Sequence, residues 1–306
     1  MRDKITQVLD EIQAGNHLSL ARAITIVENN IDGYEELLLN LENTGHAKVI
    51  GITGPPGAGK STLVNALIRH WVAENKKIAV IAVDPSSPFN YGAILGDRIR
   101  MADFYNHPNV FIRSLATRGA LGGLNAKIIE ITDVLKHGPF DYILVETVGV
   151  GQSEVEIAGL ADCTIVALVP EAGDEVQTLK AGIMEIADIF VVNKADRDAA
   201  ETLYRNLCIM VHEKAGTDEE TPVIKTIATL NTGINELSAA IDNYLATHNT
   251  QPEKRLQLLA DKCIQLIQQD KMKGIHRQDI LKALVNAASN PQFNLYAFTW
   301  GFVDKS

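Results

Sequence analysis

The feature that most constrains the fold is a series of short apolar runs, rich in Val and Ile, that alternates with longer helical stretches from residue 47 onward. Such runs suit strands buried on both faces, and strand–helix alternation is typical of a parallel sheet with helices on both sides. The runs are Lys48–Thr53, Lys77–Asp84, Val110–Ser114, Asp141–Glu146, Cys163–Val169, Ile189–Asn193 and Val223–Thr226. The sequence therefore predicts an α/β fold with a mostly parallel central sheet, whose ligands bind beyond the carboxyl ends of the strands.

Helical patterns precede and follow this alternation. Apolar residues recur at helical spacing in residues 3–45 and again in 253–288, and the polar stretch HNTQPEK precedes the second pattern. We expect an N-terminal helical segment (1–46), an α/β domain (47–248) and a C-terminal helical segment (249–306). The first segment is expected to be a packed cap, with a separate recognition module as the alternative. The aromatic tail NPQFNLYAFTWGFV fits either a core or a subunit contact.

Composition narrows the classes of partner. The formal net charge of -10 makes the chain a poor non-specific binder of nucleic acid or membrane surfaces. The cysteines, Cys163, Cys208 and Cys263, are scattered and form no CxxC pair, which argues against a disulfide framework or a structural zinc site. The N-terminus lacks the apolar stretch of a signal peptide, and no window approaches the roughly 18 apolar residues of a membrane helix. We expect a soluble cytoplasmic protein.

A glycine-rich segment, GPPGAGKST, follows the first apolar run and fits the pattern G-x-x-x-x-G-K-[ST]. Its glycines let the backbone curl so that N–H groups point at phosphate oxygens, and the following helix N-terminus adds its dipole. Lys60 is predicted to neutralise the β- and γ-phosphates, and Ser61 to hold Mg²⁺. A structural glycine loop is the alternative. The predicted phosphate contacts are Gly54, Pro55, Pro56, Gly57, Ala58, Gly59, Lys60, Ser61 and Thr62.

A second motif, NKAD at residues 193–196, ends a later apolar run and predicts a guanine site. The Asp196 carboxylate can accept hydrogen bonds from N1–H and the exocyclic amino group of guanine, and adenine offers neither donor there. Hydrogen bonds to a charged group contribute about 1.5–3 kcal/mol each, which favours GTP over ATP. Asn193 and Lys194 are expected to brace the loop and cover the base. After the next run, the backbone of Ile227, Ala228 and Thr229 is expected to reach the guanine oxygen.

Carboxylates at other run ends predict the metal site. Glu146 ends the run in DYILVETVG, where it would hold Mg²⁺ through water, and the Gly149 N–H would sense the γ-phosphate. Many GTPases orient water with a Gln directly after that glycine, but here the first Gln is Gln152. We therefore expect slow intrinsic hydrolysis that a partner accelerates. Asp84 and Asp97 would join the metal or position water, with ordinary turn and helix residues as the alternative.

Three further segments carry charge or glycine near these ends. Arg98 and Arg100 offer positive charge for phosphates or a partner. The stretches TRGALGGL (Thr117–Leu124) and EAGDEVQTLKAG (Glu171–Gly182) both follow apolar runs. We interpret both stretches as switch-like segments, with rigid turns as the alternative.

Together, GPPGAGKST, VDPSSP, GDRIRM, TRGALGGL, ETVGVGQSE, EAGDEVQ and NKAD resemble the MeaB/ArgK-like GTPases, which are P-loop proteins associated with methylmalonyl-CoA mutase. The resemblance runs in order from about Gly51 to Ile234. It implies a GTPase that gates adenosylcobalamin loading and protects an acyl-CoA mutase, and it implies a homodimer formed through C-terminal helices. By motif position, Lys60, Ser61, Asp97 and Glu146 would serve phosphate and Mg²⁺, with Asp84 near the attacking water. The segment Gly173–Gly182, including Lys180, would relay the presence of the mutase.

Other functions compete with this interpretation. A metallochaperone GTPase for nickel or zinc usually carries His or Cys tracts, whereas the eight histidines here are dispersed. The ArgK name also carries the description of an amino-acid transport-associated kinase or ATPase, but no HRD or DFG kinase element occurs. A nucleotide-dependent scaffold with vestigial hydrolysis is disfavoured by the intact Lys60-Ser61 pair and by Glu146.

Overall fold

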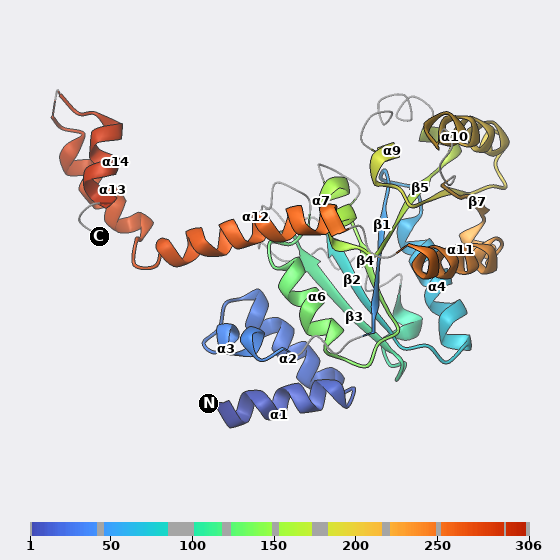
Figure 1. Cartoon of the computed structure of the whole chain (residues 1–306), viewed down its shortest axis with the longest axis horizontal. Coiled ribbons are helices and arrows are strands. Elements are labelled where there is room, and N and C mark those ends of the chain that lie inside the picture. Colours follow the sequence, from blue (N-terminus) through green and yellow to red (C-terminus); the bar gives the residue numbers. More distant parts are fainter. Residues whose placement is uncertain are drawn as a thin grey trace. The chain divides into compact units, whose positions relative to one another are not determined.

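The computed structural model describes residues 2–41, 46–84, 101–117, 124–148, 153–172, 183–215, 221–248, 252–290 and 292–303. The chain divides into two compact units, Met1–Arg255 and Leu256–Ser306. Figure 1 labels the elements of both units along the chain.

Within the described residues, a seven-stranded sheet with the order β3-β2-β4-β1-β5-β6-β7 forms the centre of the first unit. Every pair of neighbouring strands is parallel, which confirms the predicted α/β class. The strands are β1 Lys48–Thr53, β2 Ile78–Asp84, β3 Val110–Ala116, β4 Tyr142–Glu146, β5 Cys163–Leu168, β6 Ile189–Asn193 and β7 Val223–Thr226. Because β2, β4, β5 and β6 are buried along their whole length, their sequences are apolar rather than alternating.

Helices cover both faces of this sheet (Figure 1). Helices α4 (Lys60–Ala73) and α11 (Ile234–Thr247) share one apolar core with β1 and β5. The opposite face carries α7 (Ser153–Leu160) and α10 (Ala200–Ala215). Contact between α7 and β1 is close, since a Cβ on Gly51 would lie 2.5 Å from Ile157 Cγ1.

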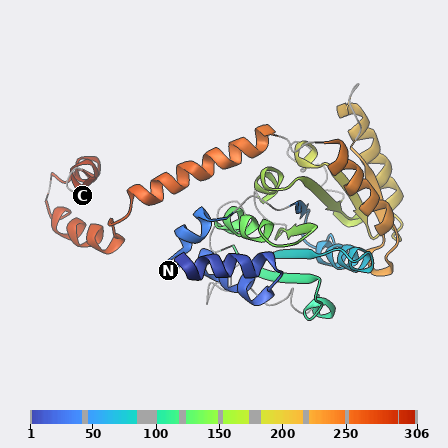
Figure 2. The same ribbon diagram turned by 60° about the horizontal axis from the view of Figure 1, so that its bottom comes forward.

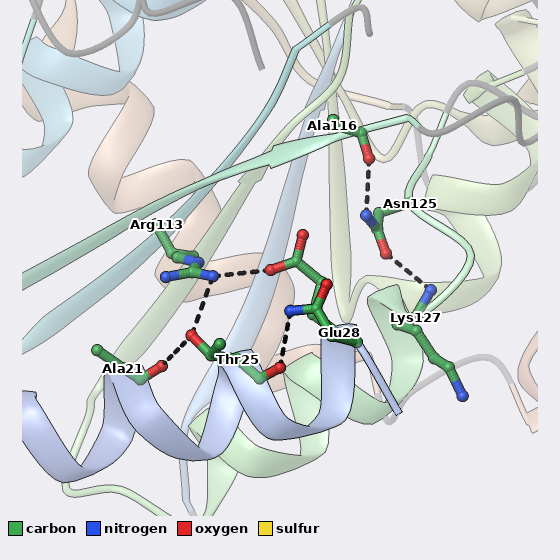
Figure 3. A network of polar contacts seen from close by, with 8 residues as sticks. Ala21, Thr25, Glu28, Arg113, Ala116, Asn125 and Lys127 are labelled. Carbon is green, nitrogen blue, oxygen red and sulfur yellow. Dashed lines mark hydrogen bonds and ion pairs between the residues drawn. The ribbon is translucent and has the colours of Figure 1, made fainter. Parts of the chain in front are cut away.

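The N-terminal helices are α1 (Arg2–Gln13), α2 (His17–Glu28) and α3 (Tyr34–Leu39), and α2 packs against α6 (Ile128–Lys136). Figure 2 shows these helices beside β3 and α6. Polar contacts fix them there: Arg113 of β3 donates to Glu28 at 2.7 Å and to Thr25 at 3.3 Å (Figure 3). The N-terminal helices therefore belong to the same compact unit as the sheet.

The second unit contains most of α12 (Pro252–Lys271) and all of α13 (Arg277–Ala287) and α14 (Leu295–Val303). The helical pattern expected over 253–288 is interrupted between α12 and α13. Gly274 there has φ +88°, a left-handed conformation that ends helices. No helix within the described residues is both long enough and apolar enough to cross a membrane.

Candidate functional site

Loops at the carboxyl ends of the strands form two adjoining hollows. The larger, of about 430 Å³, is called the phosphate cleft, and the smaller, of about 190 Å³, is called the base pocket. The phosphate cleft is lined by Pro56, Gly57, Gly59, Lys60, Ser61, Thr62, Val83, Asp84, Glu146, Thr147, Val148 and Lys194. The base pocket is lined by Gly59, Thr62, Asn193, Lys194, Asp196, Arg197, Ile227, Ala228 and Thr229. Both predicted motifs thus lie at one edge of the sheet, where parallel α/β folds bind ligands.

The loop between β1 and α4 needs glycine at defined points. Gly54 has φ +138°, and a Cβ there would lie 2.1 Å from the carbonyl oxygen of Ala167. Gly59 has φ +81°, and its Cβ would lie 2.5 Å from Asn193 Nδ2. This backbone curls tightly before it enters α4, which begins at Lys60. Backbone N–H groups at a helix N-terminus form a ready anion site.

Lys60 is buried in the phosphate cleft, with 7% of its surface exposed. Its Nζ donates to the carbonyl oxygens of Gly54 at 2.8 Å and Pro55 at 3.1 Å. A buried ammonium group needs such partners, and carbonyl oxygens are weaker partners than phosphate. The ammonium group is therefore already positioned within the loop that a phosphate would enter.

Ser61 and Glu146 join the loop to the end of β4. Ser61 Oγ donates to Glu146 Oε1 at 2.6 Å, and both side chains are buried. Asp84, at the end of β2, is buried beside the same cleft. Mg²⁺ is commonly bound by one or two protein oxygens together with phosphate oxygens and water, so this hydroxyl–carboxylate pair fits that ion. In the described part of the chain, no group of three or more His, Cys, Asp or Glu could hold a metal.

Asn193 connects the two hollows. Its Nδ2 donates to the carbonyl oxygen of Ala58 at 2.9 Å, and its Oδ1 accepts from Thr226 Oγ1 at 3.1 Å and from the Ala228 N–H at 3.3 Å. The side chain is 2% exposed, so these bonds are shielded from water. Asn193 therefore ties the phosphate loop to β7 and to the loop that follows it.

Lys194 and Asp196 follow the buried Asn193 in the loop after β6. Lys194 has φ +56° and lines both hollows, while Asp196 is exposed at the rim of the base pocket. Ala195 N–H donates to the carbonyl oxygen of Thr226 at 3.0 Å, which fixes the loop between them. A non-glycine residue with left-handed backbone dihedrals is strained, and here the hydrogen bonds of the surrounding loop hold Lys194 in that conformation.

Other predicted site residues fall outside the described residues. These are Asp97, Arg98, Arg100, Gly149, residues 118–123 of the Thr117–Leu124 stretch, and the segment Gly173–Gly182 with Lys180. Sequence reasoning missed four lining residues: Val83, Thr147 and Val148 in the phosphate cleft and Arg197 in the base pocket. The only sequence signal for Arg197 is its place directly after NKAD.

Comparison with known proteins then identifies the family. Residues 20–279 match the family described as methylmalonyl Co-A mutase-associated GTPase MeaB. The chain belongs to the MeaB family. A provisionally named GTPase of Pyrococcus abyssi is 48% identical over 238 residues, which are 76% of this chain and 74% of that one. The GTPase ArgK of Escherichia coli is 34% identical over 304 residues, 95% and 88% of the two chains.

A solved structure shares the fold along nearly the whole chain. The crystal structure of an LAO/AO transport system kinase aligns with a TM-score of 0.67 at 25% identity, covering 99% of this chain and 97% of that one. This MeaB-family protein is thus a P-loop GTPase, which binds guanine nucleotide and hydrolyses GTP. The predicted family and enzyme class are confirmed.

Proposed function

We propose that this MeaB-family GTPase is a cytoplasmic chaperone for an adenosylcobalamin-dependent acyl-CoA mutase of the methylmalonyl-CoA mutase type. GTP binding and hydrolysis gate cofactor loading and protect the mutase from inactivation. The match of residues 20–279 to a family described by its association with methylmalonyl Co-A mutase carries this proposal. No nucleic-acid or membrane partner is part of it, in keeping with the net charge of -10.

In the phosphate cleft, Lys60 exchanges its carbonyl partners for the β- and γ-phosphates. Ser61 and Glu146 hold Mg²⁺, with Asp97 as a further ligand, and the ion when bound offsets negative charge on the phosphates. Asp84 lines the same cleft and positions the attacking water. Gly149 contributes its N–H to the γ-phosphate.

In the base pocket, Asp196 accepts from the guanine N1–H and amino groups, and Lys194 covers the base. Ile227 and Ala228 direct their N–H groups to Thr232 O and Asn193 Oδ1, at 3.0 and 3.3 Å. The Thr229 N–H then faces the guanine oxygen. In this proposal, the Thr229 N–H binds the base, and the Ile227 and Ala228 N–H groups stabilise the loop itself.

A homodimer formed through the second unit completes the proposal. Apolar side chains of that unit are widely exposed in the single chain, including Leu256 at 64%, Val285 at 66% and Trp300 at 69%. Large exposed apolar patches mark interaction sites. Sedimentation equilibrium of the purified protein is expected to give the mass of two chains, and a single-chain mass at micromolar concentration would contradict the dimer.

GTP turnover with and without a mutase tests the chaperone function. Phosphate release from GTP is expected to be slow for the protein alone, below about 1 s⁻¹, since no Gln directly follows Gly149. Adding an adenosylcobalamin-dependent acyl-CoA mutase is expected to raise the rate severalfold, and Lys60→Ala gives the background rate. An unchanged rate with several such mutases would leave a GTPase whose client is of another class.

The description of the aligned structure as a transport system kinase favours a second candidate, phosphoryl transfer to a protein in amino-acid transport. The two candidates differ in where the γ-phosphate goes. With γ-labelled GTP, the chaperone function gives inorganic phosphate only, whereas the kinase function leaves label on a protein acceptor.

A further inference from the structure

An ion pair not foreseen from the motifs lies at the base pocket. Glu171, in the short helix η2 (Pro170–Ala172) that follows β5, pairs with the guanidinium of Arg197. Arg197 directly follows Asp196, and both residues line the base pocket. The pair therefore links the end of β5 to the loop that follows β6.

The Arg197 guanidinium is a natural competitor for the carboxylate that is to read guanine. Arginine stays charged at all relevant pH values, and its planar fork matches a carboxylate in bidentate geometry. An arginine bound to Asp196 would occupy the oxygens that guanine N1–H and the amino group require. Within the described residues, however, Asp196 makes no hydrogen bond or ion pair.

We propose that Glu171 is a positioning residue for guanine recognition. It holds the Arg197 guanidinium, so that the Asp196 carboxylate stays open to the base. This inference rests on the proposed role of Asp196. It adds a specificity determinant that lies outside both nucleotide motifs.

The fold holds the segments that carry Glu171 and Arg197 close to each other. The end of β5, β6 and the start of α10 share one buried cluster, in which Leu168, Val192 and Ala200 are each at most 2% exposed. The side chains of Arg197 and Glu171 themselves are 46% and 49% exposed. Because exposed ion pairs contribute little to stability, the pair is expected to act on binding rather than on folding.

A rival explanation is that Arg197 itself contacts the nucleotide and Glu171 only orients it. The two explanations differ in the effect of removing both charges. If Arg197 competes with guanine, its removal restores binding to a variant that lacks the Glu171 carboxylate. If Arg197 is a nucleotide ligand, its removal leaves binding as weak or weaker.

The test is calorimetric titration of Glu171→Gln and of Glu171→Gln/Arg197→Gln with GDP and with inosine diphosphate, which lacks the amino group. Glu171→Gln is expected to weaken GDP binding roughly two- to fivefold, as competition from one exposed ion pair allows. The ratio of the GDP affinity to the inosine diphosphate affinity is also expected to fall in Glu171→Gln. The double variant is expected to bind GDP more tightly than Glu171→Gln does, and high salt is expected to shrink the difference.

Glu201→Gln is the matched control. Glu201 pairs with Lys225 at 3.0 Å, and the two side chains are 51% and 43% exposed, but neither lines the base pocket. GDP binding by this control is expected to equal that of the unaltered protein.

Two results would overturn the inference: unaltered GDP binding by Glu171→Gln, or a double variant no tighter than Glu171→Gln. Asp196→Asn separates this failure from a failure of the proposed base site. If Asp196→Asn keeps the preference for GDP over inosine diphosphate, the base site itself is wrong. If Asp196→Asn loses the preference while Glu171→Gln is silent, only the inference about Glu171 fails.

Discussion

The phosphate cleft and the base pocket adjoin each other but are built differently. Three side chains of the cleft are buried and already paired: Lys60 donates to two carbonyl oxygens, and Ser61 donates to Glu146. In the base pocket, the selective group, Asp196, is exposed. Buried charges are costly without partners, whereas exposed ones are solvated by water. In the proposed function, the cleft would exchange existing partners for phosphate, and the pocket would keep a carboxylate open for a base.

Replacing the cleft's cation should have the largest effect on activity. Lys60→Ala removes the ammonium group that we propose neutralises the transferring phosphate, and loss of one such electrostatic contact commonly lowers kcat on the order of 10²–10³-fold. Single-turnover hydrolysis at saturating GTP measures this effect. Lys194→Ala, which removes the lysine proposed to cover the base, should weaken binding more than it lowers the single-turnover rate. Equal losses of rate in both variants would erase the contrast between cleft and pocket.

The sheet was predictable because buried parallel strands are apolar throughout. Both Lys48–Thr53 and Ile189–Asn193 were predicted with the bounds that the structure gives. The break at Gly274 was missed, since apolar periodicity continues on both sides of one glycine.

The place of the candidate site was predictable where its residues are contiguous in the sequence. The glycine-rich segment and NKAD are contiguous motifs whose chemistry can be inferred from the residues themselves. The contact of Asn193 with the Ala58 carbonyl oxygen and the pairing of Glu171 with Arg197 depend on which strand ends adjoin. Neither the strand order nor the side-chain directions can be read from spacing along one chain.

Breaking the link between the two hollows should impair both. Asn193→Ala leaves the Ala58 carbonyl, the Thr226 hydroxyl and the Ala228 N–H without this partner. Each unsatisfied buried group costs about 1–3 kcal/mol, so with three such groups we expect a loss of at least about 3 kcal/mol in the free energy of unfolding. Urea unfolding measures the loss, and nucleotide titration should show weaker binding as well. A fully stable variant would mean that the hollows are independent.

Removing the charge at the pocket rim should affect nucleotide binding but not the stability of the fold. Asp196→Asn keeps one acceptor oxygen and loses one charge-assisted hydrogen bond worth about 1.5–3 kcal/mol, so GDP affinity should fall on the order of 10- to 100-fold. Stability should not change, because the side chain is exposed. Titration with GDP and inosine diphosphate, together with urea unfolding, gives both quantities. A large loss of stability would show that Asp196 supports the fold, which contradicts the contrast drawn with the buried cleft.

The smallest effect is expected at Gly57, which has a left-handed backbone conformation but open space where a Cβ would lie. A Cβ on Gly57 would meet nothing within 4 Å, although its φ is +79°. Gly57→Ala should therefore cost only the left-handed strain of a non-glycine residue, about 1–2 kcal/mol. Gly59→Ala has a similar φ of +81° but would also press on Asn193 Nδ2. Urea unfolding should rank Gly59→Ala as the less stable variant. The contact with Asn193 lies where the two hollows join, so the nucleotide affinity of Gly59→Ala should also fall further than that of Gly57→Ala. Equal losses of stability and affinity in the two variants would show that the Asn193 side chain shifts easily.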